Sequence, residues 1–539
     1  IKRSEKALGY SATSVNSERI TETRTSDIMS SLSGKIAGVQ ISNTSSDPGA
    51  SNSVIIRGVS SLSGSNQPLY VVDGVPLSAG GIETINPRDI ESIDILKDDF
   101  GNGANAVNPD DVESMTILKG AAATALYGSR AASGVVMITT KTGKKNKGLG
   151  IEYNGGLQWS TILRLPEFQN EFGMGWNGDH TELENGSWGP RFDGSMQLWG
   201  NKYENSQKLK PYSPIKNNIK DFFDAGFRYN NSVSFNGATD KSEYYVSFSQ
   251  ISDDGMVPTD ADSYDKYTFS ARGSHKVKAL TFSSSLNYSY QKNKFATTGQ
   301  GLTMLNSLYQ TPRDVSIISL QDQNDIFNSP GYFYTPYGVM NPYYILENYL
   351  NEYDAERFYG KFQVDYDFLK YFKFTYRMGL DTTTGQSNRG EPNLYALFYE
   401  GTPNGEGMGS NSPFYGKEGS YSQQITRRRE INQDLLLSFS MPINDFQINA
   451  LAGFNGNERK YSYLYSSVSK LTIPTWYNLS NSAATPTVEQ YLSLRRLMGV
   501  FGQVDLSWRN MLYVTLTARN DWSSTLPKEN RSFFYPGVT

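Results

Sequence analysis

The feature that most constrains this sequence is a series of long stretches in which every second residue is apolar. In the stretch from Val233 to Phe248, Val, Phe and Tyr alternate with mostly polar residues on either side of a polar turn. Successive side chains of a β-strand point to opposite faces, so the pattern predicts hairpins with one apolar and one polar face. Four more stretches repeat it, at Tyr267–Tyr290, Phe362–Leu380, Leu435–Phe454 and Met498–Ala518.

The lengths of these runs and of their connections favour a membrane β-barrel. Each run has about 8–12 residues, enough for a tilted strand across a membrane, whereas a sandwich strand usually has about 5–6. Short turns join the two strands of each hairpin and long gaps separate the hairpins, an asymmetry that a soluble β-sandwich has no reason to keep. The long gaps are Leu163–Arg228, Ser252–Tyr264, Lys292–Ala355, Thr383–Ile425 and Asn457–Gln490.

Composition agrees with this class and excludes others. Mean hydropathy is −0.51, and no run of about 18 apolar residues could form a membrane helix. A net charge of −4 offers no basic face for nucleic acid. There is no Cys and only two His, His180 and His275, about 95 residues apart. We therefore expect no His-rich metal centre and no enzyme activity, because no nucleophile–base arrangement is visible.

The chain divides near residue 145. Residues 1–145 have no Trp and interleave helical with strand patterns, which predicts a small α/β domain. Residues 146–539 hold all seven Trp and the alternating hairpins. Lys141–Gly148 is a basic, glycine-containing linker between them. In the first region we expect a helix over Ser26–Gly38 and strands at Val39–Ser42, Ser53–Arg57, Leu69–Val72, Met115–Leu118 and Gly134–Thr140.

One internal repeat lies in the first region. Ile85–Asp98 matches Val107–Gly120 at 8 of 14 positions, with an offset of 22. Two copies at so short a period do not make a solenoid. The repeat is either a local duplication or a stretch of uncertain sequence assignment.

The hairpins and one earlier run give about eleven strands. An odd number leaves an open edge, and unpaired backbone groups in lipid cost several kcal/mol each. We therefore expect strands after Thr539 to close the barrel.

Several segments occur here in combination. In the first region they are Leu69–Pro76, Asn108–Lys119, Ala125–Ala132 and Gly134–Gly143; in the second they are Trp188–Pro190, Phe192–Gly194, Arg519–Pro527 and Glu529–Arg531. Together they resemble the plug domain and the barrel of the SusC/RagA-like branch of TonB-dependent outer-membrane transporters, of the Bacteroidota type. This family normally has a single copy of the segment repeated at 85–98.

The resemblance implies a fold and a function. Residues 1–145 would be an α/β plug inside a transmembrane antiparallel β-barrel of 22 strands, and residues 146–539 the N-terminal half of that barrel. Its implied activity is TonB-dependent import of an oligosaccharide or peptide across the outer membrane. The implied partners are TonB, through a box upstream of Ile1, a SusD-like surface lipoprotein, outer-membrane lipid and a second copy of the SusCD pair. The alternatives are a non-transporting scaffold subunit and a soluble β-rich adhesin, which the plug motifs disfavour.

Five groups of residues are candidates for these roles, and each has a simpler explanation. An aromatic and polar cluster could bind substrate or pack its own loop, and tyrosines at 331–349 could line a cavity or pack together. Two arginines could pair with wall carboxylates as plug latches or be solvated. Glycines could allow the turns of a movable plug or of any domain, and three aspartates could hold calcium or lie in a solvated loop. The residues are Trp176, Asn177, Asp179, Trp188 and Asp193 for substrate; Arg57 and Arg130 for the latch; Gly58, Gly74, Gly128 and Gly134 for turns; Asp253, Asp260 and Asp262 for calcium.

Overall fold

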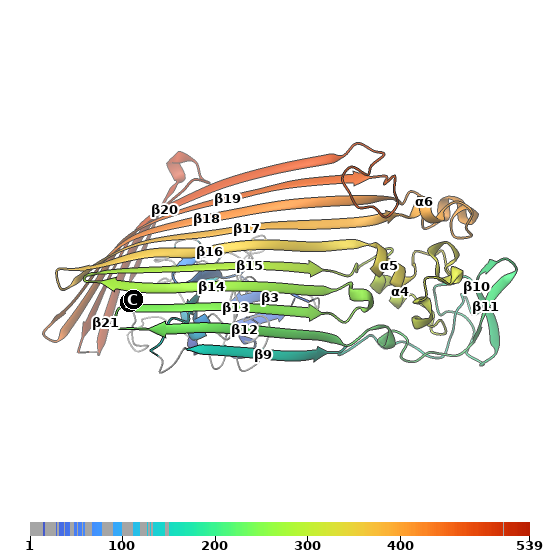
Figure 1. Ribbon diagram of the computed structural model, residues 1–539, viewed down its shortest axis with the longest axis horizontal. Helices are drawn as coiled ribbons and strands as arrows, with labels where there is room; N and C mark the ends of the chain where they lie inside the picture. Colours follow the sequence, from blue (N-terminus) through green and yellow to red (C-terminus); the bar gives the residue numbers. More distant parts are fainter. Residues whose placement is uncertain are drawn as a thin grey trace.

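The structure is a computed structural model (Figure 1). It describes residues 150–509 and 511–538 and some of the first 149 residues. Among those 149, the described residues are 14–16, 29, 32–36, 38–43, 48–50, 52–56, 58–59, 67–77, 90–99, 112–118, 127, 130 and 133–145.

One antiparallel sheet of twelve strands dominates the described residues. Its strands run side by side along the long axis of the molecule (Figure 1). In sheet order they are β22 (Ser532–Val538), β21 (Leu512–Ser523), β20 (Thr487–Trp508), β19 (Phe446–Ser469), β18 (Glu418–Ile443), β17 (Phe372–Asn393), β16 (Leu350–Phe368), β15 (Leu280–Lys294), β14 (Ser263–Val277), β13 (Ser242–Asp254), β12 (Gly226–Ala238) and β9 (Ile151–Ser160).

The five predicted hairpins are present, and the sheet has one strand more than the predicted eleven. Val233 faces Phe248 across the first hairpin, and Leu437 faces Ala452 across β18 and β19. The additional strand is β22, whose sequence SFFYPGV places three aromatics in succession and contains Pro and Gly. Such a segment lacks the period of two that identified the other strands.

Several strands extend far beyond the predicted runs. The segments Thr383–Ile425 and Asn457–Gln490, predicted as loops, are partly strand. β17 continues to Asn393, β18 begins at Glu418 and β19 continues to Ser469. β18 alone has 26 residues, whereas a tilted strand needs about 9–11 to cross a membrane. The extensions carry polar residues on both faces, as in Thr382–Thr384, so they show no apolar alternation.

The two faces of the main sheet differ in chemistry. Leu435 and Leu437 of β18 lie on what we call the outer face and are 41% exposed. Glu430, Asn432 and Asp434, at alternate positions of the same strand, are buried on the inner face. This arrangement is what an apolar exterior around a polar interior requires of a β-strand.

The first region forms its own mixed sheet beside the main one. Predicted strands match β2, β3, β4, β7 and β8 to within a few residues, and β2 pairs with β3 as a separate hairpin. The sheet order is β1 (Ser14–Asn16), β6 (Ile90–Asp99), β7 (Val112–Leu118), β8 (Ser133–Thr140), β4 (Leu69–Val72) and β5 (Val75–Pro76); the hairpin is β2 (Val39–Asn43) with β3 (Asn52–Ile56).

The internal repeat supplies two neighbouring strands of this sheet. β6 and β7 pair in parallel, with Ser92 opposite Ser114, which is the offset of the repeat. Both also pair with β8, where Leu96 and Leu118 each have Val135 as their partner. The two copies therefore have equivalent pairing with the same strand.

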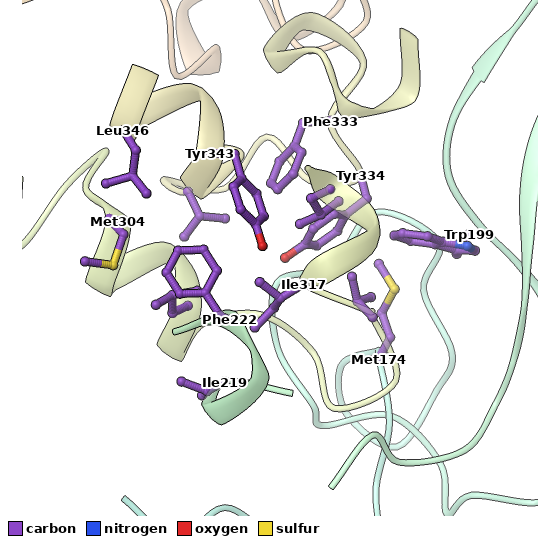
Figure 2. Close-up of a cluster of buried hydrophobic side chains, with 14 of the residues drawn as sticks. Met174, Trp199, Ile219, Phe222, Met304, Ile317, Phe333, Tyr334, Tyr343 and Leu346 are labelled. Carbon is purple, nitrogen blue, oxygen red and sulfur yellow. The ribbon is translucent and has the colours of Figure 1, made fainter. Parts of the chain in front are cut away.

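The long connections at one end of the main sheet fold into what we call the loop lobe, residues 161–225, 295–349 and 394–417 (Figure 1). Its core includes Trp199, Phe222, Tyr334 and Tyr343, which point toward one another (Figure 2). The buried tyrosines at 331–349 thus pack their own lobe. Its elements are β10 (Met196–Tyr203), β11 (Ser206–Pro211), η6 (Lys220–Phe222), α4 (Met304–Tyr309), η8 (Ile318–Leu320), η9 (Ile326–Asn328), η10 (Pro330–Tyr332), α5 (Pro342–Asn348), α6 (Leu394–Phe398) and η11 (Glu406–Asn411).

Within residues 150–509 and 511–538, two short helical turns lie outside the lobe, η7 (Pro258–Asp260) and η12 (Lys528–Asn530). Among the residues that the structure describes, no helix combines the length and the apolar character needed to cross a membrane.

We expect Leu437→Arg to destabilise the sheet in a bilayer by about 2–4 kcal/mol, because arginine at the middle of an apolar belt loses its hydration. Leu464→Arg is the matched control, since Leu464 is 43% exposed and Leu437 is 41% exposed on the same face. Leu464 lies about 40 Å along β19 from Ala452, the residue opposite Leu437, at about 3.3 Å per residue. Leu464→Arg should therefore destabilise the sheet by only about 0–1 kcal/mol. Urea unfolding in lipid vesicles measures both, and equal losses would contradict the assignment of the belt.

Candidate functional site

The first region contacts the inner face of the main sheet through a buried arginine. Arg130 Nη1 lies 3.3 Å from Glu430 Oε1 and 3.4 Å from Asn432 Oδ1, and Nη2 lies 3.5 Å from Asn455 Oδ1. The Glu430 side chain is 1% exposed. Burial and the neighbouring Arg459 lower the pKa of Arg130 to about 10, so the guanidinium still carries its charge at neutral pH.

Glu430 is also held by neighbouring side chains of the main sheet. Arg459 Nε lies 3.0 Å from Glu430 Oε2, and Asn457 donates to Glu430 Oε1 at 2.7 Å. Asn457 donates to Asn432 Oδ1 as well, at 2.7 Å. The carboxylate that meets Arg130 is therefore fixed before the first region docks, which lowers the entropy lost on forming the contact.

A tight turn of the first region makes a second contact. Asp73 and Gly74 connect β4 to β5 with φ values of 49° and 83°, as the Asp-Gly pair predicts. The Asp73 carboxylate accepts from Thr140 N at 3.0 Å and Thr140 Oγ1 at 2.7 Å. Its backbone carbonyl accepts from Lys361 Nζ at 3.2 Å. The turn is thus fixed internally and presents its backbone to the main sheet.

Two glycines allow this close approach. A Cβ at Gly74 would overlap Nη1 of Arg377, and a Cβ at Gly379 in β17 would overlap Val75. Arg377 is held by Asp434, with Nε and Nη2 at 2.9 and 2.7 Å from Oδ2. A side chain at residue 379 would therefore clash with Val75, and one at residue 74 would displace the Arg377 guanidinium.

The other predicted turn and latch residues have different outcomes. Gly58 and Gly134 have φ values of 103° and 96°, which L side chains rarely adopt. A Cβ at Gly58 would meet nothing within 4 Å, so this turn needs only the backbone freedom. Arg57 and Gly128 lie outside the described residues.

Most of the predicted aromatic cluster belongs to a small hairpin of the loop lobe. Trp176 and Asp179 exchange backbone hydrogen bonds of 3.1 and 3.0 Å around Asn177 and Gly178, both with positive φ. Gly178 N donates to Trp188 O at 2.8 Å, which brings the second tryptophan alongside. Trp176 is 54% exposed and Trp188 is 69% exposed, so both rings remain available for contact.

Asp193 belongs to a separate turn. Its carboxylate accepts from Ser195 N at 2.9 Å and Ser195 Oγ at 2.6 Å. These hydrogen bonds lower the pKa of Asp193. The Asp193 side chain therefore stabilises its own turn. The exposed aromatic surface belongs to the hairpin of Trp176 and Trp188.

Buried charges hold the lobe beneath this hairpin. Lys210 pairs with Asp314, whose other oxygen accepts from Met174 N at 2.9 Å. Burial lowers the pKa of Lys210, and Asp314 opposes that change. Arg313 donates to the carbonyls of Gln169 and Ile215 at 3.0 and 3.2 Å. The lobe is a rigid platform because segments far apart in sequence share these bonds.

The three aspartates proposed for calcium do not form a common group. Asp253 pairs with Arg228, and Asp262 accepts from Met256 N and Val257 N at 3.1 and 3.0 Å. Asp260 lies in η7. Within the described ranges, no three or more His, Cys, Asp or Glu side chains gather where they could hold a metal ion.

Sequence analysis missed the wall side of the contact. Glu430, Asn432 and Asp434 alternate along β18 opposite Arg459, Asn457 and Asn455 of β19. Both strands have a charged or amide residue at every second position, and these residues are opposite one another. This pattern could have indicated a polar inner wall from the sequence.

Comparisons with known proteins point in one direction. Residues 4–102 match the family model described as TonB-dependent Receptor Plug Domain. The chain is 26% identical to TonB-dependent receptor P26 of Formosa agariphila and 26% identical to TonB-dependent receptor SusC of Bacteroides thetaiotaomicron. Each match covers 98% of this chain and 48% of the relative. The chain thus spans about half the length of these curated relatives.

The fold agrees with a solved structure. The RagAB peptide importer in its open-open state matches with a TM-score of 0.72 at 20% identity, over 99% of this chain and 57% of that one. At this identity the match establishes the fold, a first-region sheet packed against the inner face of a large antiparallel barrel sheet.

We expect Gly74→Ala to loosen the docking of the first region more than Gly58→Ala does. Both changes force alanine to a positive φ, at about 1 kcal/mol. Only Gly74→Ala also pushes Arg377 away from Asp434. Limited proteolysis of the first region should therefore be faster in Gly74→Ala than in Gly58→Ala, and equal rates would argue against the turn as a docking point.

Proposed function

Since this chain is SusC/RagA-like, a TonB-dependent receptor plug with an outer-membrane β-barrel, we propose that it serves TonB-dependent import of a large nutrient. The nutrient is an oligosaccharide or a peptide. TonB pulls on the plug from the periplasmic side, and some of the plug moves out of the barrel lumen. A SusD-like surface lipoprotein captures the nutrient at the loop end.

The observation that carries this proposal is the chemistry of the plug–wall contact. Arg130 reaches the wall through an ion pair and amide hydrogen bonds, and Lys361 and Asn432 donate to plug carbonyls at 3.2 and 3.3 Å. Water can replace each of these partners when the plug moves. A contact of this kind suits a plug that must stay in place and still be released.

The loop lobe supports the capture step. It has its own core and internal ion pair, and it presents Trp176 and Trp188 at the surface. Exposed aromatic side chains on a rigid support are typical of surfaces that bind a partner or ligand. We assign this hairpin to contact with the lipoprotein or with the incoming nutrient.

TonB dependence of uptake is the test. Cells that express the full-length protein should import labelled oligosaccharides or peptides only when TonB and the proton gradient are intact. Deletion of TonB should abolish uptake while surface binding persists. Binding partners in the envelope without any TonB-dependent uptake would favour the scaffold alternative and overturn the transport proposal.

We expect Arg130→Met to weaken retention of the plug. The change leaves Glu430 buried with Arg459 as its remaining cation, and losing one partner of a buried ion pair costs about 3–5 kcal/mol. Because Arg459 remains, the lower end of this range applies. Plug release under force, or protease cleavage within the plug of membrane-embedded protein, should become easier.

Lys145→Met is the control for this change. Lys145 also links the N-terminal region of the chain to the barrel, through Asp240, but the two side chains are 67% and 87% exposed. Exposed ion pairs contribute little to stability, so plug release should stay unchanged. If both variants behaved as the unmodified protein does, Arg130 would not be a latch.

A further inference from the structure

A recess of about 400 Å³ lies on the barrel wall beside the Arg130 contact. It is formed where β18, β19 and β20 run side by side. Its lining includes Arg428, Arg459, Arg495, Tyr461 and Tyr491.

These five side chains face the lumen. Glu430 faces inward because it contacts Arg130 of the plug, and Arg459 is its register partner. Directly opposed residues of antiparallel strands share a face. Arg495 is opposite Arg459, and Arg428 is opposite Tyr461, two residues on from Arg459 along β19.

The recess has more positive than negative charge. Among the residues that the structure describes, Glu430 is the only carboxylate in its lining, and both Arg130 and Arg459 already contact it. The guanidinium of Arg495 forms no ion pair with a carboxylate in the part of the chain that the structure describes. A concave surface with unbalanced charge concentrates ions of the opposite sign, so the recess favours an anion.

Tyrosine rings lie beside these arginines. Arg428 Cζ is 5.4 Å from the centroid of the Tyr461 ring. Tyr463 and Tyr491 stack at 5.6 Å with an interplanar angle of 20°, and Tyr491 is 46% exposed. Exposed ring faces pack against the C–H face of a pyranose, and adjacent guanidinium groups bind a carboxylate or sulfate in bidentate fashion.

We propose that this recess binds an anionic sugar ring, so that the imported nutrient is an acidic oligosaccharide. The inference rests on the proposed import function and narrows its substrate class. Along β18, Arg428 is nearer to the loop end at Glu418 than to the turn end at Ile443. A substrate entering from the loop end therefore meets Arg428 before it meets Glu430, the latch carboxylate that also lines the recess.

The outer face of the same strands supplies a matched control. Arg496 follows Arg495 in β20 and so points to the opposite face. There Arg496 and Arg429 contact Glu458 at 2.8 and 3.1 Å, which balances some of their charge. Arg496→Gln removes the same charge as Arg495→Gln without changing the lumen.

The test is calorimetric titration of the full-length protein in detergent at 0.15 M salt, a condition of the assay chosen to screen distant charges over about 8 Å. Tetragalacturonate is the acidic probe and maltotetraose the neutral one. We expect tetragalacturonate to bind at least about tenfold more tightly, and Arg428→Gln with Arg495→Gln to weaken it about tenfold or more, as charged hydrogen bonds predict. Arg496→Gln should leave its affinity unchanged.

Three outcomes would overturn the inference. The acidic and neutral probes could bind equally or not at all, Arg496→Gln could weaken binding as much as the lumen variants, or tetraglutamate could bind more tightly than tetragalacturonate. Uptake by cells with and without TonB is measured in parallel. TonB-dependent uptake with a neutral preference contradicts only the acidic-sugar inference. Acidic binding without TonB-dependent uptake contradicts the transport proposal and leaves only the assignment of the recess as a binding site for an acidic sugar.

Discussion

The structure depends on the rule that successive side chains of a β-strand point to opposite faces. In a membrane barrel every backbone group is paired with a neighbouring strand, so the side chains alone distinguish lipid from lumen. On β18 this rule places Leu435 and Leu437 outside and Glu430, Asn432 and Asp434 inside. The wall that the plug contacts is therefore polar, so the plug has to present polar groups that can hydrogen-bond to it.

A polar contact has consequences for movement. Pulling two apolar surfaces apart in water would cost a free energy of about 25 cal/mol for every Å² of apolar surface exposed. Arg130 and Glu430 lose each other on separation but regain hydration, because the net value of a buried ion pair is the small difference between attraction and desolvation. The glycines at 74 and 379 add shape to this contact, since they let turn and wall approach without interlocking side chains. Plug and wall can then be specific in position and still separable.

The sequence predicted those segments of the molecule that follow a local period or a local turn. The five hairpins and the Asp73-Gly74 turn are confirmed because alternation and positive φ depend on neighbouring residues. β22 and the extended ends of β17 and β19 were not found, because their residues lack the apolar alternation.

The contacts of the candidate site depend on distant residues. Arg130 lies 300 positions from Glu430, and nothing near either of them in sequence indicates the other. The lobe core is likewise built from Trp199, Tyr334 and Tyr343, which no single period connects. Arg130 could be named from the sequence, but its partners could be found only from the arrangement of β18 and β19.

The recess and the latch share one group of charges, and this links substrate binding to plug position. Arg459 contacts Glu430, which also contacts Arg130, and Arg459 itself lines the recess. An anion in the recess adds negative charge near Arg130 and so favours the docked plug. Coupling between two sites is reciprocal: withdrawal of Arg130 removes positive charge from the neighbourhood of the anion and weakens its binding. The pull that moves the plug would therefore also loosen the substrate from the wall, at the step when the substrate has to leave it.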